Sequence, residues 1–179
     1  LTNVENFHPD SFLGLLIGVV LWSALERKWN WYWISVVLAL LVKEDVALIV
    51  IPIGLWVALR RDLRRGAWTV VVSLGAMALM FLVVMRSFTG VAFRNSWRIP
   101  FGGFAGLFRV AFRQPLELWK YLTSEDRSKY LFQLLSPTAL AFIAAPSVAL
   151  TSAAVIGANL ISTFWYQHQI GYHYSLVIV

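Results

Sequence analysis

Three adjacent charged residues, Lys43-Glu44-Asp45, interrupt an otherwise apolar stretch that runs from Ile34 to Leu59. One acid or lysine at the centre of a bilayer costs about 2.5–3.5 kcal/mol on insertion scales. Three such residues therefore do not fit in the middle of one lipid-exposed helix. The triplet must lie at a turn near a membrane surface or face a polar cavity, and this requirement constrains the topology of the whole chain.

The composition indicates a multi-pass protein of the cell membrane. Of the 179 residues, 59% are hydrophobic and only 13% are charged, whereas soluble domains carry about 25% charged residues. The net charge of +6 is not interpreted as a nucleic-acid signal, because the position of Lys and Arg in a membrane chain matters more than their sum. We expect membrane lipids, and no nucleic acid, as partners. The absence of cysteine excludes disulfides and thiolate metal sites.

The ends of the chain predict a piece of a longer protein. The sequence begins with Leu1 rather than Met, and Ser175–Val179 has the composition of another apolar span. We therefore expect residues 1–179 to form a single membrane domain that is incomplete at both ends.

Two basic loops predict where the chain turns. Arg27-Lys28 and the run Arg60–Arg65 both lie next to apolar segments, and the positive-inside rule places both in the cytoplasm. The chain must then cross the membrane twice between them, and the triplet Lys43-Glu44-Asp45 is the only polar place to reverse. One helix from Trp33 to Leu59 would instead be about 40 Å long against a hydrocarbon core of about 30 Å. The two resulting helices are short, so their tips must line a water-filled or protein-buried cavity.

The second half predicts an outer segment followed by a helical hairpin. Ala67–Met85 is a clean span, and residues 86–129 become an outer segment, although its basic residues run against the positive-inside rule. Within it, apolar residues recur at helical spacing in Gly103–Arg113, which predicts an interfacial amphipathic helix, and Pro115–Leu122 predicts a second. Tyr130–Ser162, broken by prolines, predicts a hairpin of two short helices. The fold class is all-α, a polytopic bundle of about six short spans with one or two interfacial helices.

Two further polar clusters fall on the same, extracytoplasmic side as the triplet in this topology. His8 and Asp10 flank Pro9, and either could bind a metal or phosphate or transfer protons; alternatively, Asp10 is a helix cap. The cluster Tyr172-His173-Tyr174 could form a cavity wall with His173 bonded to a phosphate or hydroxyl, or it is an interfacial aromatic belt. We interpret His168 as a loop residue and Asn159 as an interhelical hydrogen-bonding residue.

The triplet itself offers three chemical roles. Lys43 could hold a phosphate as a point charge, and Glu44 or Asp45 could bind a divalent cation or act as a general base. The alternative is a polar turn with an internal ion pair. The short spacings typical of metal sites are absent from the sequence, so the metal and any cofactor stay unassigned.

Three stretches resemble the signatures of one known family: Asn6-Phe7-His8-Pro9-Asp10, Leu41-Val42-Lys43-Glu44-Asp45 and Tyr172-His173-Tyr174-Ser175. It is an uncharacterised prokaryotic family of polytopic membrane proteins, catalogued as a domain of unknown function and grouped with the GT-C glycosyltransferases. The resemblance implies a GT-C-like fold and transfer of a sugar from a polyprenyl-phosphate donor on the outer face. The GT-C pattern also implies a catalytic acid in a first outer loop that is absent from this chain.

The resemblance and the chemistry together select the candidate site residues. The candidate catalytic residues are Glu44, Asp45, His8 and His173, and the candidate substrate-binding residues are Lys43, Asp10, Tyr172 and Tyr174. Two other classes of function stay open. A transporter or lipid-handling protein would use Lys43-Glu44-Asp45 as an intramembrane relay in broken helices, and a non-catalytic scaffold would use the charged clusters only for packing.

Overall fold

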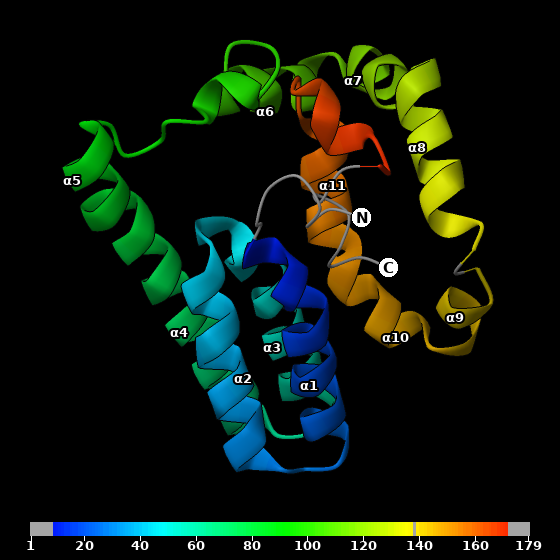
Figure 1. The fold of residues 1–179 in the computed structure, drawn as a ribbon. Coiled ribbons are helices and arrows are strands. Elements are labelled where there is room, and N and C mark those ends of the chain that lie inside the picture. The colour runs from blue at the N-terminus through cyan, green and yellow to red at the C-terminus, as the bar shows by residue number, and fades with distance from the viewer. Residues whose placement is uncertain (1–8, 138, 172–179) are drawn as a thin grey trace.

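The computed structural model describes residues 9–137 and 139–171, and within these all side chains except those of residues 9, 10, 125 and 139–141. Every regular element in this part of the chain is helical (Figure 1). The first four helices form a bundle, and the remaining helices form an arch beside and above it. The all-α prediction is therefore confirmed for the described residues.

The first hairpin consists of two apolar helices joined at a basic turn. A short 3₁₀ turn, η1 (Pro9–Phe12), leads into α1 (Leu13–Leu25), and α2 (Trp29–Val42) returns beside it. The turn is closed by Arg27 in the left-handed region, with φ of 55°, and the Lys28 ammonium lies 4.4 Å from the centre of the Trp22 ring. The hairpin places the basic turn at the lower end of the bundle in Figure 1.

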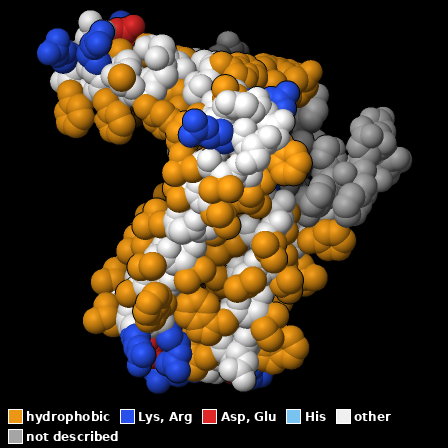
Figure 2. Space-filling view, turned by 90° about the vertical axis from the view of Figure 1, so that its left-hand side faces the viewer, with side chains coloured by type: hydrophobic (Ala, Val, Ile, Leu, Met, Phe, Trp, Pro, Cys, Tyr) orange, Lys and Arg blue, Asp and Glu red, His pale blue; other side chains and the backbone are white. Residues whose placement is uncertain are grey.

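The chain reverses at the charged triplet, as the sequence predicts. A 3₁₀ turn, η2 (Glu44–Val46), separates α2 from α3 (Ala47–Arg60), which runs back towards the basic end. At that end Asp62 caps α4 (Leu63–Leu79), because its carboxylate accepts a hydrogen bond of 2.8 Å from the Arg65 N–H. Both basic loops therefore lie at one end, where Figure 2 shows a cluster of Lys and Arg.

Glycines allow α3 and α4 to pack closely. A Cβ added to Gly66 would lie 2.2 Å from the backbone nitrogen of Ala58, and one added to Gly54 would lie 3.0 Å from Thr69 Cβ. Small residues bring membrane helices together in the same way. A buried hydrogen bond of 2.7 Å between the Tyr32 and Thr69 hydroxyls joins α2 to α4. These contacts surround an apolar core of fully buried side chains that includes Val20, Val36, Val50, Ile53 and Val57.

One helix is long enough to cross a membrane. After α4 the helix continues through a π-helical segment, η3 (Met80–Met85), into α5 (Arg86–Thr89), and Leu63–Thr89 counts 27 residues. Its length is about 40 Å, against a hydrocarbon core of about 30 Å. Within the described residues it is the single helix that meets both length and hydropathy criteria. The other apolar helices, Leu13–Leu25, Trp29–Val42 and Pro146–Ile161, are shorter, so the expected six spans and GT-C arrangement stay predictions.

The outer segment forms two exposed helices. After a 3₁₀ turn, η4 (Ser96–Arg98), a tight loop with positive φ at Phe101, Gly102 and Gly103 leads into α6 (Phe104–Arg113). Gly106 packs directly on this loop, since an added Cβ would lie 1.6 Å from the Phe101 carbonyl oxygen. Then α7 (Pro115–Leu122) begins at its proline, and neither helix buries a residue. The helices match the ranges expected for interfacial helices.

The last hairpin differs in detail from the two short helices expected over Tyr130–Ser162. Its first arm, α8 (Glu125–Leu135), begins five residues earlier with a polar turn, and α9 (Ala139–Ala144) forms the bend. The second arm is α10 (Pro146–Ala149), η5 (Leu150–Ser152) and α11 (Ala153–Ile161), followed by η6 (Trp165–His168). Pro146 starts α10 because proline fits the first helical position and cannot continue the preceding helix.

Candidate functional site

The triplet leaves helical geometry at Lys43. Lys43 is extended, with φ of −163° and ψ of 154°, and Glu44 and Asp45 lie in the following 3₁₀ turn. All three residues are half-buried. The Lys43 ammonium lies 3.2 Å from an Asp45 carboxylate oxygen. A turn removes the restriction that neighbouring residues on a helix diverge by about 100°, so both carboxylates can serve one site.

The depth of the triplet follows from helix length. Both α2 and α3 contain 14 residues and rise about 21 Å from the basic end of the bundle. With the basic end at the membrane surface, as the positive-inside rule predicts, a hydrocarbon core of about 30 Å would extend about 10 Å beyond the triplet. Figure 1 shows the long helix α4–α5 rising past the turn between α2 and α3. Irregular backbone at such a depth is tolerated where it lines a cavity.

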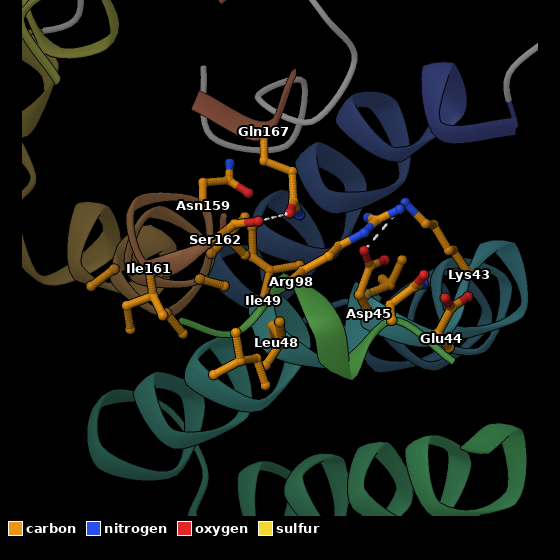
Figure 3. Close-up of a pocket in the computed structure, with 18 of the residues that line it drawn as sticks. Lys43, Glu44, Asp45, Leu48, Ile49, Arg98, Asn159, Ile161, Ser162 and Gln167 are labelled. Atoms are coloured by element: carbon orange, nitrogen blue, oxygen red, sulfur yellow. Dashed lines mark hydrogen bonds and ion pairs between the residues drawn. The ribbon is translucent and has the colours of Figure 1, made fainter. Parts of the chain in front are cut away.

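A pocket of about 500 Å³ adjoins the triplet (Figure 3). Its charged end is formed by Lys43, Glu44, Asp45 and Arg98, and amide side chains of Asn159 and Gln167 lie on another wall. The remaining lining is mainly apolar and comes from α3, η3, α6 and α11; it includes Leu48, Ile49, Phe81, Phe104, Leu107, Ala154, Ala158 and Ile161. The pocket is thus amphipathic, with its four ionisable groups gathered on two turns.

Arg98 is the cation of the pocket that is not among the candidate site residues from the sequence. It belongs to η4, and its carbonyl oxygen accepts a 2.7 Å hydrogen bond from the Thr163 N–H. Its guanidinium lies 4.3 Å from the centre of the Phe164 ring, and its buried Nε has no hydrogen-bond partner among the described residues. Figure 3 shows the side chain directed towards Lys43 and Asp45. The pocket therefore has two cations, from segments 55 positions apart in the sequence.

Asn159 combines two roles. Its side-chain N–H donates a 3.1 Å hydrogen bond to the Tyr130 hydroxyl, which joins α11 to α8 and confirms the expected interhelical bond. The same residue also lines the pocket. The small residues beside it on α11, Ala154, Gly157 and Ala158, leave the volume of the pocket open because they project little side chain into it.

Several candidate residues lie outside the part of the chain that the structure describes. They are His8, Tyr172, His173 and Tyr174, together with the side chain of Asp10. Their proximity to the triplet stays a prediction. In the described residues no group of three or more His, Asp and Glu side chains is arranged to hold a metal ion. Glu44 and Asp45 supply two carboxylates, so a divalent cation also stays a prediction.

A buried polar cluster joins the outer segment to α11, and the sequence analysis missed it. Arg127 is buried and donates hydrogen bonds to the carbonyl oxygens of Leu160 (2.8 Å) and Ser162 (3.1 Å) and to the Tyr121 hydroxyl (2.7 Å). The Tyr121 hydroxyl in turn donates to the Ile161 carbonyl at 3.1 Å. These bonds satisfy carbonyls at the end of α11 that have no partner within the helix.

His168 belongs to this cluster rather than to an open loop. The residue is buried, and its Nε2 lies 2.8 Å from an Asp126 carboxylate oxygen. Burial, together with the nearby Arg127 charge, lowers the pKa of His168 despite the contact with Asp126. Burial alone would raise the pKa of Asp126, but the Ser124 hydrogen bond and the Arg127 charge hold it below its usual value. Neutral His168 therefore donates from Nε2 to a charged Asp126.

The pattern of short helices, basic loops and an amphipathic pocket is that of a protein embedded in a bilayer, and the comparison with known families agrees. A family model described as "Predicted membrane protein (DUF2079)" matches residues 2–179. The chain belongs to the DUF2079 family. No curated protein and no solved structure matches this DUF2079 chain significantly. Family membership gives a membrane protein of unknown function, and the role of its pocket has to be argued from chemistry.

Proposed function

We propose that this chain forms the lipid-phosphate site of a membrane transferase, which moves a sugar from a polyprenyl-phosphate donor to an acceptor. The observation that supports this proposal is the amphipathic pocket, where Lys43 and Arg98 share one end with two carboxylates and the other walls are mainly apolar. A polyprenyl phosphate divides in the same way, into an anionic headgroup and a hydrocarbon chain. Burying the chain against apolar walls is favourable, and two cations complement the phosphate.

The chemistry of transfer assigns a task to each charged residue. An acceptor hydroxyl attacks the sugar carbon that carries the phosphate, the carbon–oxygen bond to the phosphate breaks, and the electron pair leaves with the phosphate. Lys43 and Arg98 stabilise the charge that develops there. Glu44 or Asp45 accepts the proton from the acceptor hydroxyl or binds a divalent cation that assists the leaving group. In this proposal His8, Asp10, Tyr172, His173 and Tyr174 complete the walls of the site.

The proposed site opens to the extracytoplasmic side. Both basic loops lie at the opposite end of the bundle from the triplet, and basic loops favour the cytoplasm. The pocket also contacts α6 through Phe104 and Leu107, and α6 belongs to the segment expected at the outer interface. A lipid-linked donor would thus reach the charged end from the outer leaflet without crossing the bilayer.

Photolabelling tests whether the pocket takes a lipid phosphate. The full protein in proteoliposomes is labelled with a photoactivatable polyprenyl phosphate, and polyprenyl phosphate or a polyprenol of equal length serves as competitor. We expect the phosphate to compete at least tenfold better, and Lys43→Gln and Arg98→Gln to remove most of this advantage. Arg94→Gln is the matched control, because Arg94 is exposed on the same outer segment and does not line the pocket. Equal competition by polyprenol would exclude a phosphate site.

A second measurement separates transfer from transport. The protein is given a polyprenyl-phosphate sugar with a radiolabelled sugar, and both the release of the sugar and the leaflet position of the lipid are followed. If the protein is a transferase, it releases the sugar from the donor. The rate of release should fall at least a hundredfold in either Glu44→Gln or Asp45→Asn, whichever variant removes the catalytic carboxylate. Movement of the intact donor between leaflets without sugar release would contradict the transferase and support the triplet as a transport relay.

A further inference from the structure

The helices α6 and α7 form an arm, residues 104–122, with an exposed apolar edge. Five of its large apolar side chains are more than half exposed: Phe104 58%, Phe108 60%, Phe112 83%, Leu116 64% and Trp119 65%. Phe104, Phe108 and Phe112 follow each other at intervals of four, so they lie along one edge of α6. This row of exposed phenylalanines, with two further exposed apolar side chains on α7, indicates a partner, since soluble surfaces rarely expose large apolar patches.

Cations flank the apolar edge. Arg109, Arg113 and Lys120 are exposed on the arm, and Glu117 is its one acidic residue. Figure 2 shows the upper arm of the molecule with hydrophobic side chains on its underside and Lys, Arg and acidic side chains on its upper side. In Figure 2 this underside points down into the space beside the bundle, whose visible surface is also largely hydrophobic. This is the arrangement of a helix that lies in a membrane interface with its cations at the level of the headgroups.

The protein, rather than the membrane, sets the orientation of the arm. Tyr121 at the end of α7 is bonded to the Ile161 carbonyl and accepts a hydrogen bond from the buried Arg127. At the other end, the Phe101 ring in the loop before α6 packs edge-on against the Tyr121 ring, with centroids 5.3 Å apart. An arm that is fixed at both ends presents the same edge to any partner, so the partner is selected by the chemistry of that edge.

We infer that the α6–α7 arm is a binding surface for anionic phospholipid headgroups of the bilayer. Aromatic and aliphatic side chains insert below the headgroups, and Arg109, Arg113 and Lys120 contact their phosphates. Basic residues beside an apolar helical edge are attracted to negatively charged lipid surfaces, and this attraction weakens with salt. The inference requires no ligand in the pocket, so it stands or falls separately from the transferase proposal.

A local quenching experiment on the full protein tests this surface. The chain has no cysteine, so Leu116→Cys provides a single site for a fluorophore on the arm. The protein is reconstituted in phosphatidylcholine vesicles that contain equal small fractions of doxyl-labelled phosphatidylglycerol or doxyl-labelled phosphatidylcholine. We expect the anionic quencher to be at least twice as effective at low salt, with the difference shrinking at high salt.

Two variants locate the effect on the arm. Arg109→Gln/Arg113→Gln/Lys120→Gln should remove the preference, whereas Arg60→Gln/Arg64→Gln, at the opposite end of the bundle, should keep it. Equal quenching by both lipids in the parent protein would refute the anionic preference, and no quenching by either would show that the arm lies outside the membrane and has a different partner. Both of these results are measured on the parent protein, so the test does not depend on folding of the triple variant. If the triple variant folds and is still quenched more strongly by the anionic lipid, the inference is also overturned.

Discussion

Replacing Gly66 by alanine should force α3 and α4 apart. The added Cβ would lie 2.2 Å from the Ala58 nitrogen, 2.5 Å from the Ala58 Cα and 2.5 Å from the Gly54 carbonyl oxygen, whereas ordinary contact begins near 3.4 Å. All three atoms belong to the backbone of α3, so no side chain can rotate away. The helices would have to separate by about 1 Å, the amount by which the nearest distance falls short of ordinary contact.

The expected cost follows from overpacking. Inserting a methyl group into a tightly packed contact costs about 1–3 kcal/mol, while alanine gains about 0.5–1 kcal/mol over glycine within a helix. We therefore expect Gly66→Ala to lower the free energy of unfolding by about 1–2 kcal/mol, which is about a tenfold change in the unfolding equilibrium. Separation of the helices would also lengthen the hydrogen bond between Tyr32 and Thr69.

The same helix supplies the control. Gly75 lies in α4 with no atom within 4 Å of an added Cβ, so Gly75→Ala should be neutral or slightly stabilising. Gly54→Ala meets Thr69 at 3.0 Å and should fall between the two. Unfolding of the purified protein in mixed micelles, titrated with sodium dodecyl sulfate and followed by tryptophan fluorescence, gives the order. Equal stability of Gly66→Ala and Gly75→Ala would refute the close approach of α3 and α4.

Two further predictions concern the buried polar cluster. Arg127→Gln should lower the free energy of unfolding by about 1–3 kcal/mol, because it leaves buried carbonyls at the end of α11 without their donor. Arg109→Gln, at an exposed position, is the control in the same titration. Equal losses of stability in the two variants would contradict a stabilising role for the Arg127 cluster. Acid should also weaken the cluster. His168 has a lowered pKa in the folded protein, so stability should fall as the pH drops below about 6.5, where the unfolded histidine takes up a proton first. The lowered pKa of Asp126 adds a further loss below about pH 3.9. Unfolding midpoints measured between pH 4 and 8 should show the loss of stability that is due to His168, and this loss should be smaller in His168→Gln. The same loss of stability in His168→Gln would show that another group causes it.

The arrangement of the bundle could be predicted because its signals are local. The cost of the charged triplet in lipid requires a break at Lys43, and the two basic loops require a reversal there, which the structure shows in the 3₁₀ turn after α2. The spacing of phenylalanines similarly predicts α6. Each of these inferences uses the charge or the helical periodicity of a segment, and none requires the pairing of particular side chains from distant segments.

The second cation of the pocket and the Arg127 cluster could not be predicted in this way. Arg98 reaches the pocket through a bond to Thr163, and Arg127 meets the end of α11 more than 30 positions further along the chain. No periodic pattern encodes such pairings. The sequence also places the beginning of the first arm of the last hairpin five residues too late, because the first turn of α8 is polar and the apolar signal begins only at Tyr130.

The short segment Leu160–Phe164 connects α8 to the charge in the pocket. Arg127 holds the carbonyls of Leu160 and Ser162 on one side, and Thr163 is bonded to the Arg98 carbonyl on the other, with Phe164 beneath the guanidinium. A tilt of α7 and α8 relative to the bundle would therefore displace Arg98 without changing any residue of the pocket. The surrounding bilayer exerts force on helices that these bonds hold in place, so its thickness and curvature would become physical regulators of how strongly the pocket attracts an anion.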